Sequence, residues 1–274
     1  MSWPATCILI ALWFTLVPLS AEGKALTFGV VPQQSAKKMT EKWQPFIDYV
    51  SNYTGLNVEF RTAKDIPTFE ANLTAGLYDL AYMNPYHFVV FNDSVGYRAL
   101  AHQADKKIRG LIVVHKDSPI QTLSDLNGSE IAFPAPAAFA ATIITSAHLR
   151  KNNIVFIPRN VKSHDSVYLS VQRNFFKAGG GIFRTFNISP EAIKNDLRVL
   201  WQSEGYTPHP IATHPKMAED DRQAILNALI ALSNDSSKSS ILSDIGLGGF
   251  IASRDSDWDD VRNLGIASLS RPHL

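Results

Sequence analysis

Three residues of the types found in hydrolase triads stand side by side in the chain, as Ser163, His164 and Asp165. A catalytic triad needs side chains that converge from separate elements, whereas adjacent side chains point in different directions. We therefore interpret the tripeptide as a polar loop that opens a helix, in which Ser163 or Asp165 caps free N–H groups. The start of such a helix is also suited to bind an anion.

No other pattern in the chain predicts catalysis or a bound metal. The sequence lacks GxSxG, P-loop, GxGxxG and HExxH motifs. The glycines at 179–181 lack the lysine or helix entry of a phosphate-binding loop, and they indicate a strand that approaches its neighbours closely. The nearest histidines, His209 and His214, are separated by a proline-containing segment, and carboxylates do not cluster. We expect a protein that is not an enzyme, with no catalytic residues, no cofactor and no metal.

Polar and aromatic side chains gather where short apolar runs end. Tyr82, Tyr86 and His87 surround a turn at residues 84–85, between the strand-like residues 79–83 and a helix. Tyrosine and histidine carry polar atoms that need partners, and ligands bind at the carboxyl ends of strands in α/β proteins. We expect at least one of these three residues to face a ligand, with core packing as the alternative.

A similar loop follows the first apolar run, residues 26–31. That strand end carries two amides and a hydroxyl, from Gln33, Gln34 and Ser35, which could contact a ligand. The alternative is that these residues form a solvated turn.

The hydrophobic pattern predicts the scaffold that positions these loops. Strand-like and helical segments alternate, which indicates parallel sheets covered by helices. We predict an α/β fold of two Rossmann-like lobes, with residues 105–210 inserted into a first lobe built from residues 22–104 and 211–274. Two crossing segments, near residues 103–109 and 207–211, would form a hinge with a cleft beside it.

The first 21 residues are typical of an export signal. Residues 7–18 are uncharged and apolar but shorter than the roughly 20 residues that span a bilayer. We expect cleavage after Ala21, or less favourably after Ala25, and a periplasmic location; an uncleaved anchor is the alternative. The single cysteine, Cys7, lies inside this segment.

The overall charge argues against nucleic acid as a partner. The 26 Lys and Arg residues balance 25 Asp and Glu residues, for a net charge of +1, so there is no basic face for a phosphate backbone. If this chain binds an anion, a few residues at loop ends must recognise it, rather than the field of a basic surface.

Six blocks of sequence, taken in order, resemble the PhnD-like family of periplasmic substrate-binding proteins, which serve phosphate, phosphite and phosphonate ABC transporters. The blocks are FGVVPQQSAKKMTEKWQPFIDYV, GLYDLAYMNPYHF, LSDLNGSEIAFPAPAAF, SHDSVYLSV, LRVLWQSEGYTPHP and ILSDIGLGGFI. The resemblance implies a type II periplasmic-binding fold, whose two α/β lobes close on a small ligand about a two-strand hinge.

The resemblance also implies how the ligand is held: helix N-termini, hydroxyl donors, a His-Asp pair and aromatic residues bind an oxyanion. His164 and Asp165 match that pair, and residues 84–87 fall on the family's Gly-Pro-x-Ser turn. The family's Ser-Thr-Ser run is replaced here by Ala138, Phe139 and Ala140, which leaves backbone N–H groups and Thr142. Phe139, with the three aromatic residues near position 84, would suit a ligand with an organic or cationic part.

The predicted function is that of a monomeric periplasmic solute-binding protein that captures a small oxyanion or a related organic solute for an ABC permease. The alternative is a ligand-sensing module that acts with a membrane-bound histidine kinase or chemoreceptor. The candidate ligand-binding residues are Gln33, Gln34, Ser35, Tyr82, Asn84, Tyr86, His87, Phe139, Thr142, His164 and Asp165.

Overall fold

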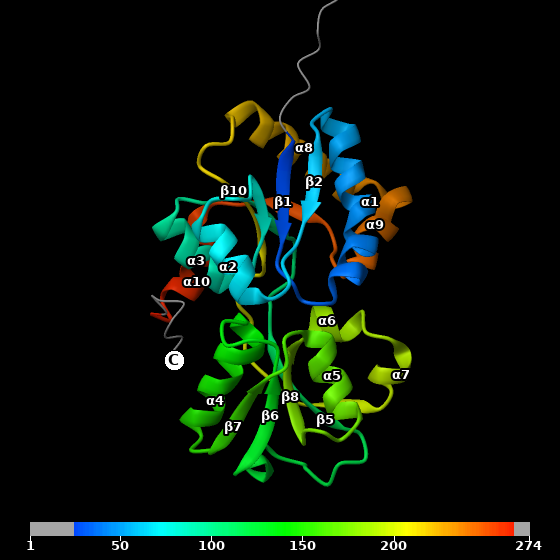
Figure 1. The fold of residues 1–274 in the computed structure, drawn as a ribbon, viewed down its shortest axis with the longest axis vertical. Coiled ribbons are helices and arrows are strands. Elements are labelled where there is room, and N and C mark those ends of the chain that lie inside the picture. The colour runs from blue at the N-terminus through cyan, green and yellow to red at the C-terminus, as the bar shows by residue number, and fades with distance from the viewer. Residues whose placement is uncertain (1–24, 266–274) are drawn as a thin grey trace, which may run out of the picture.

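The strands of the chain form two separate sheets, one in each of two stacked lobes (Figure 1). The computed structural model describes residues 25–265, so the predicted export signal and the end of the chain lie outside the described residues. The first sheet has the strand order β11-β4-β10-β3-β1-β2, and the second has the order β7-β6-β8-β5-β9. The predicted two-lobed α/β fold class is confirmed. Within residues 25–265, no helix is both long and apolar enough to cross a membrane.

The first lobe begins with parallel strands joined by helices. These elements are β1 (Leu26–Val30), α1 (Ala36–Thr54), β2 (Val58–Arg61), α2 (Ile66–Thr74), β3 (Leu80–Tyr82) and α3 (Pro85–Ser94). Later segments complete the lobe as β4 (Arg98–Gln103), β10 (Pro210–Thr213), α8 (Glu219–Asn234), η3 (Ser236–Lys238), α9 (Ser239–Asp244), β11 (Phe250–Ala252), η4 (Asp255–Trp258) and α10 (Asp259–Arg262). Strand β10 is antiparallel to both β3 and β4.

Helix α1 shows how the sequence specifies these elements. Its buried residues, Met39, Trp43, Phe46, Ile47 and Val50, recur at helical spacing and pack against the sheet. Ser35 caps the start of the helix by accepting a hydrogen bond from the amide of Lys38. Gly55 ends it with φ of 73°, in the left-handed region that favours glycine. The helix start is thereby fixed directly after the loop of residues 31–35.

The second lobe contains β5 (Gly110–His115), η1 (Leu123–Leu126), β6 (Ser129–Phe133), β7 (Phe156–Asn160), β8 (Ala178–Ile182) and β9 (Leu197–Gln202). Its helical segments are the π-helical turn η2 (Phe139–Ile144), α4 (Thr145–Lys151), α5 (His164–Gln172), α6 (Phe183–Asn187) and α7 (Glu191–Lys194). Helix α5 begins at His164, because Ser163, one of the two caps expected from the sequence, accepts a hydrogen bond from the amide of Ser166. The pattern gave no indication of α6 or β11.

The three glycines of β8 allow the second lobe to pack tightly. A Cβ atom on Gly180 would lie 2.2 Å from the carbonyl oxygen of Ala141, and one on Gly181 would lie 2.4 Å from the hydroxyl of Tyr168. The predicted close backbone approach is confirmed. It places η2 directly against the sheet and so fixes the position of residues 138–141.

Two connections run side by side between the lobes. Ile108 and Tyr206 pair as an antiparallel bridge: the amide of Ile108 donates to the carbonyl of Tyr206 at 2.8 Å, and the amide of Tyr206 donates back at 2.9 Å. This bridge lies between the end of β4 and the start of β5 on one connection, and between β9 and β10 on the other. The cleft between the lobes lies beside it.

Candidate functional site

Loops and helix starts from both lobes meet at a small cavity, which we call the inner niche. It is lined by Gln33, which precedes α1, by Asn84, which caps α3, by residues 138–141 at the start of η2, by His164 in the first turn of α5, and by His209. Its volume is about 10 Å³, which is space for about one water molecule. No Asp or Glu of residues 25–265 lines the niche.

The start of η2 presents backbone donors to the inner niche. The amides of Thr142 and Ile143 both donate to the carbonyl of Ala138, the amide of Thr142 at 2.7 Å. The preceding amides, those of Phe139, Ala140 and Ala141, have no acceptor among the described residues. Unpaired N–H groups in a first helical turn favour a negative charge.

His164 brings a neutral imidazole to the niche. Its side chain is 2% exposed, and its backbone N–H donates across the cleft to the carbonyl of Gln33 at 3.1 Å. Burial, together with the charge of Arg184, lowers the pKa of His164 to about 3. The Nδ1 atom is buried and has no partner among the described residues.

His209 lies opposite, in the first lobe. Its Nε2 atom is 3.1 Å from the Nε2 atom of Gln33, and its ring stacks on Tyr82 with centroids 5.1 Å apart. Burial, and secondarily the charge of Arg184, holds the pKa of His209 well below its usual value. Both imidazoles are therefore neutral near neutral pH and act as dipolar hydrogen-bonding groups.

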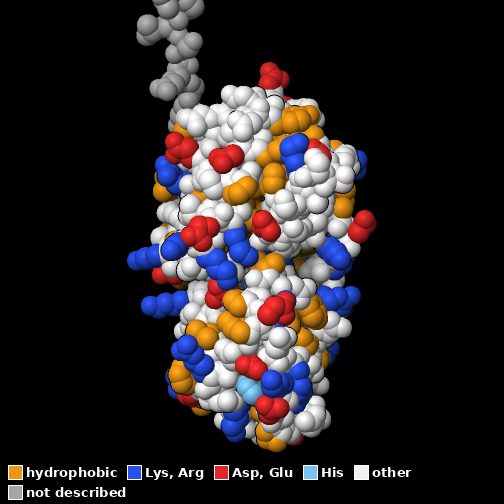
Figure 2. Space-filling model, turned by 90° about the vertical axis from the view of Figure 1, so that its right-hand side faces the viewer, with side chains coloured by type: hydrophobic (Ala, Val, Ile, Leu, Met, Phe, Trp, Pro, Cys, Tyr) orange, Lys and Arg blue, Asp and Glu red, His pale blue; other side chains and the backbone are white. Residues whose placement is uncertain are grey.

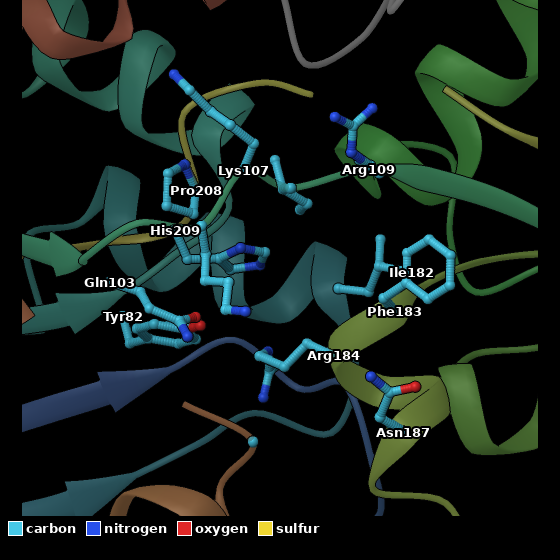
Figure 3. Close-up of a pocket in the computed structure, with 13 residues that line it drawn as sticks. Tyr82, Gln103, Lys107, Arg109, Ile182, Phe183, Arg184, Asn187, Pro208 and His209 are labelled. Atoms are coloured by element: carbon cyan, nitrogen blue, oxygen red, sulfur yellow. The ribbon is translucent and has the colours of Figure 1, made fainter. Parts of the chain in front are cut away.

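A larger cavity of about 350 Å³, which we call the outer chamber, adjoins the niche (Figure 3). Ile108, Ile182 and His209 line both cavities. The outer chamber is also lined by Lys106, Lys107, Arg109 and Arg184, and in the described part of the chain by no Asp or Glu. Lys and Arg side chains also lie at the level where the lobes meet on the face shown in Figure 2.

Arg184 extends from α6 of the second lobe across the outer chamber. One guanidinium nitrogen, Nη1, donates to the carbonyl of Ile245 in the first lobe at 2.9 Å. The guanidinium carbon lies 5.6 Å from the centre of the Tyr82 ring, a cation–π contact. Within residues 25–265, Arg184 forms no ion pair with a carboxylate, and its buried Nε atom has no hydrogen-bond partner.

A set of contacts outside the two cavities, which we call the interlobe latch, joins Gln34 and Lys38 of the first lobe to Asp165 of the second. Lys38 Nζ lies 2.9 Å from Asp165 Oδ2, and Gln34 Nε2 donates to Asp165 Oδ1 at 3.1 Å. A further contact between the lobes joins Asn84 Nδ2 to the carbonyl of Ala137 at 3.1 Å. The conformation is thus one in which the lobes touch.

The remaining candidate residues lie outside both cavities, apart from Phe139 and Tyr82. Ser35 is exposed and caps α1. Tyr86 and His87 are fully buried, and His87 Nε2 lies 2.9 Å from Glu70 Oε1. The hydroxyl of Thr142 donates to the carbonyl of Ala135 at 2.7 Å.

The aromatic residues do not form a cage for a cationic ligand. Phe139 lines the niche but packs edge-on against Tyr206, with ring centroids 5.4 Å apart. The ring of Tyr82 is already in contact with His209 and Arg184. The side chains that would surround an ammonium group are therefore occupied or buried elsewhere.

Sequence reasoning did not identify Arg184 and His209 as site residues. Arg184 follows the carboxyl end of β8, the location where ligands bind in α/β folds, and this signal was present in the sequence. His209 lies at the end of a connection between the lobes, and only the fold brings it to Gln33. In the described part of the chain, no group of three or more His, Cys, Asp or Glu residues could hold a metal ion.

Two α/β lobes, two connections between them and a cleft lined from both sides form the architecture of a two-lobed ligand-binding protein. Residues 28–258 match the model of one family, described as "ABC transporter, phosphonate, periplasmic substrate-binding protein". The chain belongs to this family. The family predicted from the sequence is confirmed, and the transporter interpretation is supported over the sensing alternative.

Curated relatives and solved structures are similar to the chain over most of its length. The chain is 22% identical over 272 residues to the phosphonates-binding periplasmic protein of Escherichia coli (strain K12), covering 92% of this chain and 79% of that protein. A binding protein component of an ABC phosphonate transporter from Pseudomonas aeruginosa superposes with a TM-score of 0.80 at 18% identity, over 88% of this chain and 85% of that chain. PhnD1 from Prochlorococcus marinus, solved in complex with methylphosphonate, has a TM-score of 0.80 at 15% identity, over 88% of this chain and 97% of that chain.

Proposed function

We propose that the cleft of this protein binds a small phosphonate or phosphate-like oxyanion and delivers it to an ABC permease. In this proposal residues 1–21 direct export through the inner membrane, and the mature protein works as a monomer in the periplasm. The observation that carries the proposal is the inner niche, where unpaired N–H groups of η2 and the neutral side chains of Gln33 and His164 meet without a carboxylate.

The chemistry of the niche favours an oxyanion for two reasons. Helix starts carry partial positive charge, and η2 and α5 of the second lobe begin there opposite the cap of α3. A phosphonate oxygen accepts several hydrogen bonds at once, which matches a set of donors that come from different elements. A cationic group would find no compensating carboxylate in the niche.

The volume of the niche indicates that binding is coupled to lobe movement. Space for about one water cannot admit a phosphonate group, so the lobes must separate for the anion to enter. Contacts from the bound anion to Gln33 on one side and His164 on the other would then favour closure, because a ligand shifts a conformational equilibrium only by its differential affinity.

A thermal-shift experiment on the exported protein tests the proposed function. Methylphosphonate, inorganic phosphate, sulfate and choline are added separately, and a bound ligand raises the melting temperature in proportion to ln(1 + [L]/Kd). We expect methylphosphonate or phosphate to raise the melting temperature and choline to have no effect. The proposed function is contradicted when choline is the compound that stabilises the protein, or when neither methylphosphonate nor phosphate does.

A further inference from the structure

We propose that the ligand is a bifunctional acid, whose second acidic group is a carboxylate that binds to Arg184 in the outer chamber. The inference rests on the proposed function, because the inner niche would hold the first acidic group. It adds a second binding position and a substrate class: a short organic phosphonate that carries a carboxylate at its other end.

The state of Arg184 is the main evidence. Its guanidinium group has five N–H donors, yet among the described residues only Nη1 has an acceptor, the carbonyl of Ile245. Carboxylates and phosphates match the planar fork of a guanidinium group, frequently in bidentate geometry. No carboxylate of residues 25–265 lies within ion-pair distance of Arg184, so an acidic group of a ligand would supply the missing partner.

The other charged side chains around the outer chamber also favour a negatively charged group at the second end of the ligand. Lys106 lines it and forms no ion pair within the described residues. Lys107 lies 3.7 Å from Asp260, and Arg109 donates to the carbonyl of Ser203 at 2.9 Å, so these two cations have partners of their own. Because no carboxylate among the described residues lines the chamber, an amino group at the second end of the ligand would face uncompensated positive charge.

The surroundings of Arg184 also suit a planar acid. Figure 3 shows Arg184 between Tyr82 and Gln103 on one side and Asn187 on the other. The two side-chain amides offer additional N–H donors. The chamber, at about 350 Å³, lies within the range of small-molecule sites, and it shares Ile108, Ile182 and His209 with the niche. One short ligand can therefore span both cavities once the lobes have separated enough for the niche to admit its phosphonate group.

Three compounds of equal chain length test the inference: propylphosphonate, 3-phosphonopropionate and 3-aminopropylphosphonate. Affinities are measured by isothermal titration calorimetry with the exported protein. We expect 3-phosphonopropionate to bind at least about tenfold more tightly than propylphosphonate, the gain typical of a charge-assisted pair, and the amino compound to bind most weakly. In Arg184→Gln the ratio between the first two compounds should fall to about one.

Controls separate this inference from the proposed function. Arg159→Gln removes an arginine that pairs with Glu130 on the second lobe, away from both cavities, and should preserve the ratio. Arg184→Lys keeps the charge and should retain part of the preference, which covers the case in which Arg184→Gln folds poorly. Equal binding of propylphosphonate and 3-phosphonopropionate by the wild type, or an unchanged ratio in Arg184→Gln, overturns the inference alone. If none of the three compounds binds, the proposed function fails and the inference fails with it.

Discussion

Lys38 and Asp165 join the two lobes by an ion pair, with Lys38 Nζ 2.9 Å from Asp165 Oδ2. Both side chains are 28% exposed, so the pair is only partly screened by solvent. Gln34 donates to the same carboxylate. In the closed arrangement Asp165 and Gln34, both candidate ligand residues, thus bond to each other across the cleft rather than line a cavity. We therefore expect these contacts to favour closure of the lobes.

Removing the charge of the interlobe latch should therefore weaken ligand binding modestly. We expect Asp165→Asn to raise the Kd for methylphosphonate by about two- to fivefold at low salt, as for a partly exposed ion pair of up to about 1 kcal/mol. The difference should shrink at 0.5 M NaCl, where charges are screened over about 4 Å. Calorimetric titrations at both salt concentrations measure the effect.

Asp196→Asn is the matched control for the latch, because Asp196 pairs with Lys116 at 2.9 Å within the second lobe. This substitution should leave the Kd unchanged. A role for the latch is refuted if both substitutions have the same effect, or if Asp165→Asn abolishes binding at every salt concentration, which would instead indicate direct contact with the ligand.

A methyl group at Gly180 should destabilise the second lobe. Its Cβ would lie 2.2 Å from the carbonyl oxygen of Ala141 and 2.5 Å from the ring of Phe133. Neither the backbone nor the buried ring can move away without disturbing the packing around it. We expect Gly180→Ala to lower the free energy of unfolding by about 2 kcal/mol or more, as for overpacked cores. Urea denaturation followed by circular dichroism provides the measurement. In Gly248→Ala, the new Cβ would have as its nearest neighbour the flexible end of Gln103 at 3.2 Å, so the free energy of unfolding should fall much less. Equal decreases in the two variants would refute this view of β8 packing.

A substitution at Tyr86 should stabilise the protein, in contrast to the one at Gly180. Its hydroxyl is buried without a hydrogen-bond partner among the described residues, and burial raises the pKa of this phenol strongly. Removing an unsatisfied polar group relieves its desolvation penalty, so Tyr86→Phe should increase the free energy of unfolding by about 1 kcal/mol. The Kd for methylphosphonate should stay unchanged. A large loss of affinity in this variant would show that Tyr86 contacts the ligand after the lobes open.

The buried histidines predict a loss of stability in mild acid. His164 has a folded pKa of about 3, and the pKa of His209 is also well below its usual value. The unfolded chain binds protons at these residues below about pH 6.5, and the folded chain does not. Stability is therefore fully present above pH 6.5 and falls progressively toward pH 3. We expect the free energy of unfolding to drop by roughly 2 to 3 kcal/mol between pH 7.5 and 5.5.

Unfolding curves of the wild type and of the double variant His164→Asn, His209→Asn measure this dependence. The double variant should be less sensitive to pH over the same interval. Identical pH slopes for the two proteins would mean that these imidazoles are protonated in the folded state, contrary to the geometry described above.

The success and failure of sequence reasoning follow from the range over which residues interact. The helix that contains Trp43 and Phe46 and the close packing of the glycines at 179–181 depend on local spacing, and both were predictable. The cap of α5 at Ser163 was also predictable, because serine is a preferred residue directly before a helix. His209 enters the site only through contacts between distant segments, which no local pattern encodes. Arg184 stands directly after the carboxyl end of β8, where the sequence did carry a signal.

The most direct test of the proposed oxyanion site is a calorimetric titration of methylphosphonate into the wild type, His164→Ala and His148→Ala. His148 stacks on Trp201 on the second lobe, outside both cavities, and serves as the control. We expect one molecule to bind per wild-type chain, an affinity at least about tenfold weaker in His164→Ala, as for a lost hydrogen bond to a charged group, and no change in His148→Ala. An affinity that is unaltered in His164→Ala, or no binding by the wild type, would contradict the proposed site.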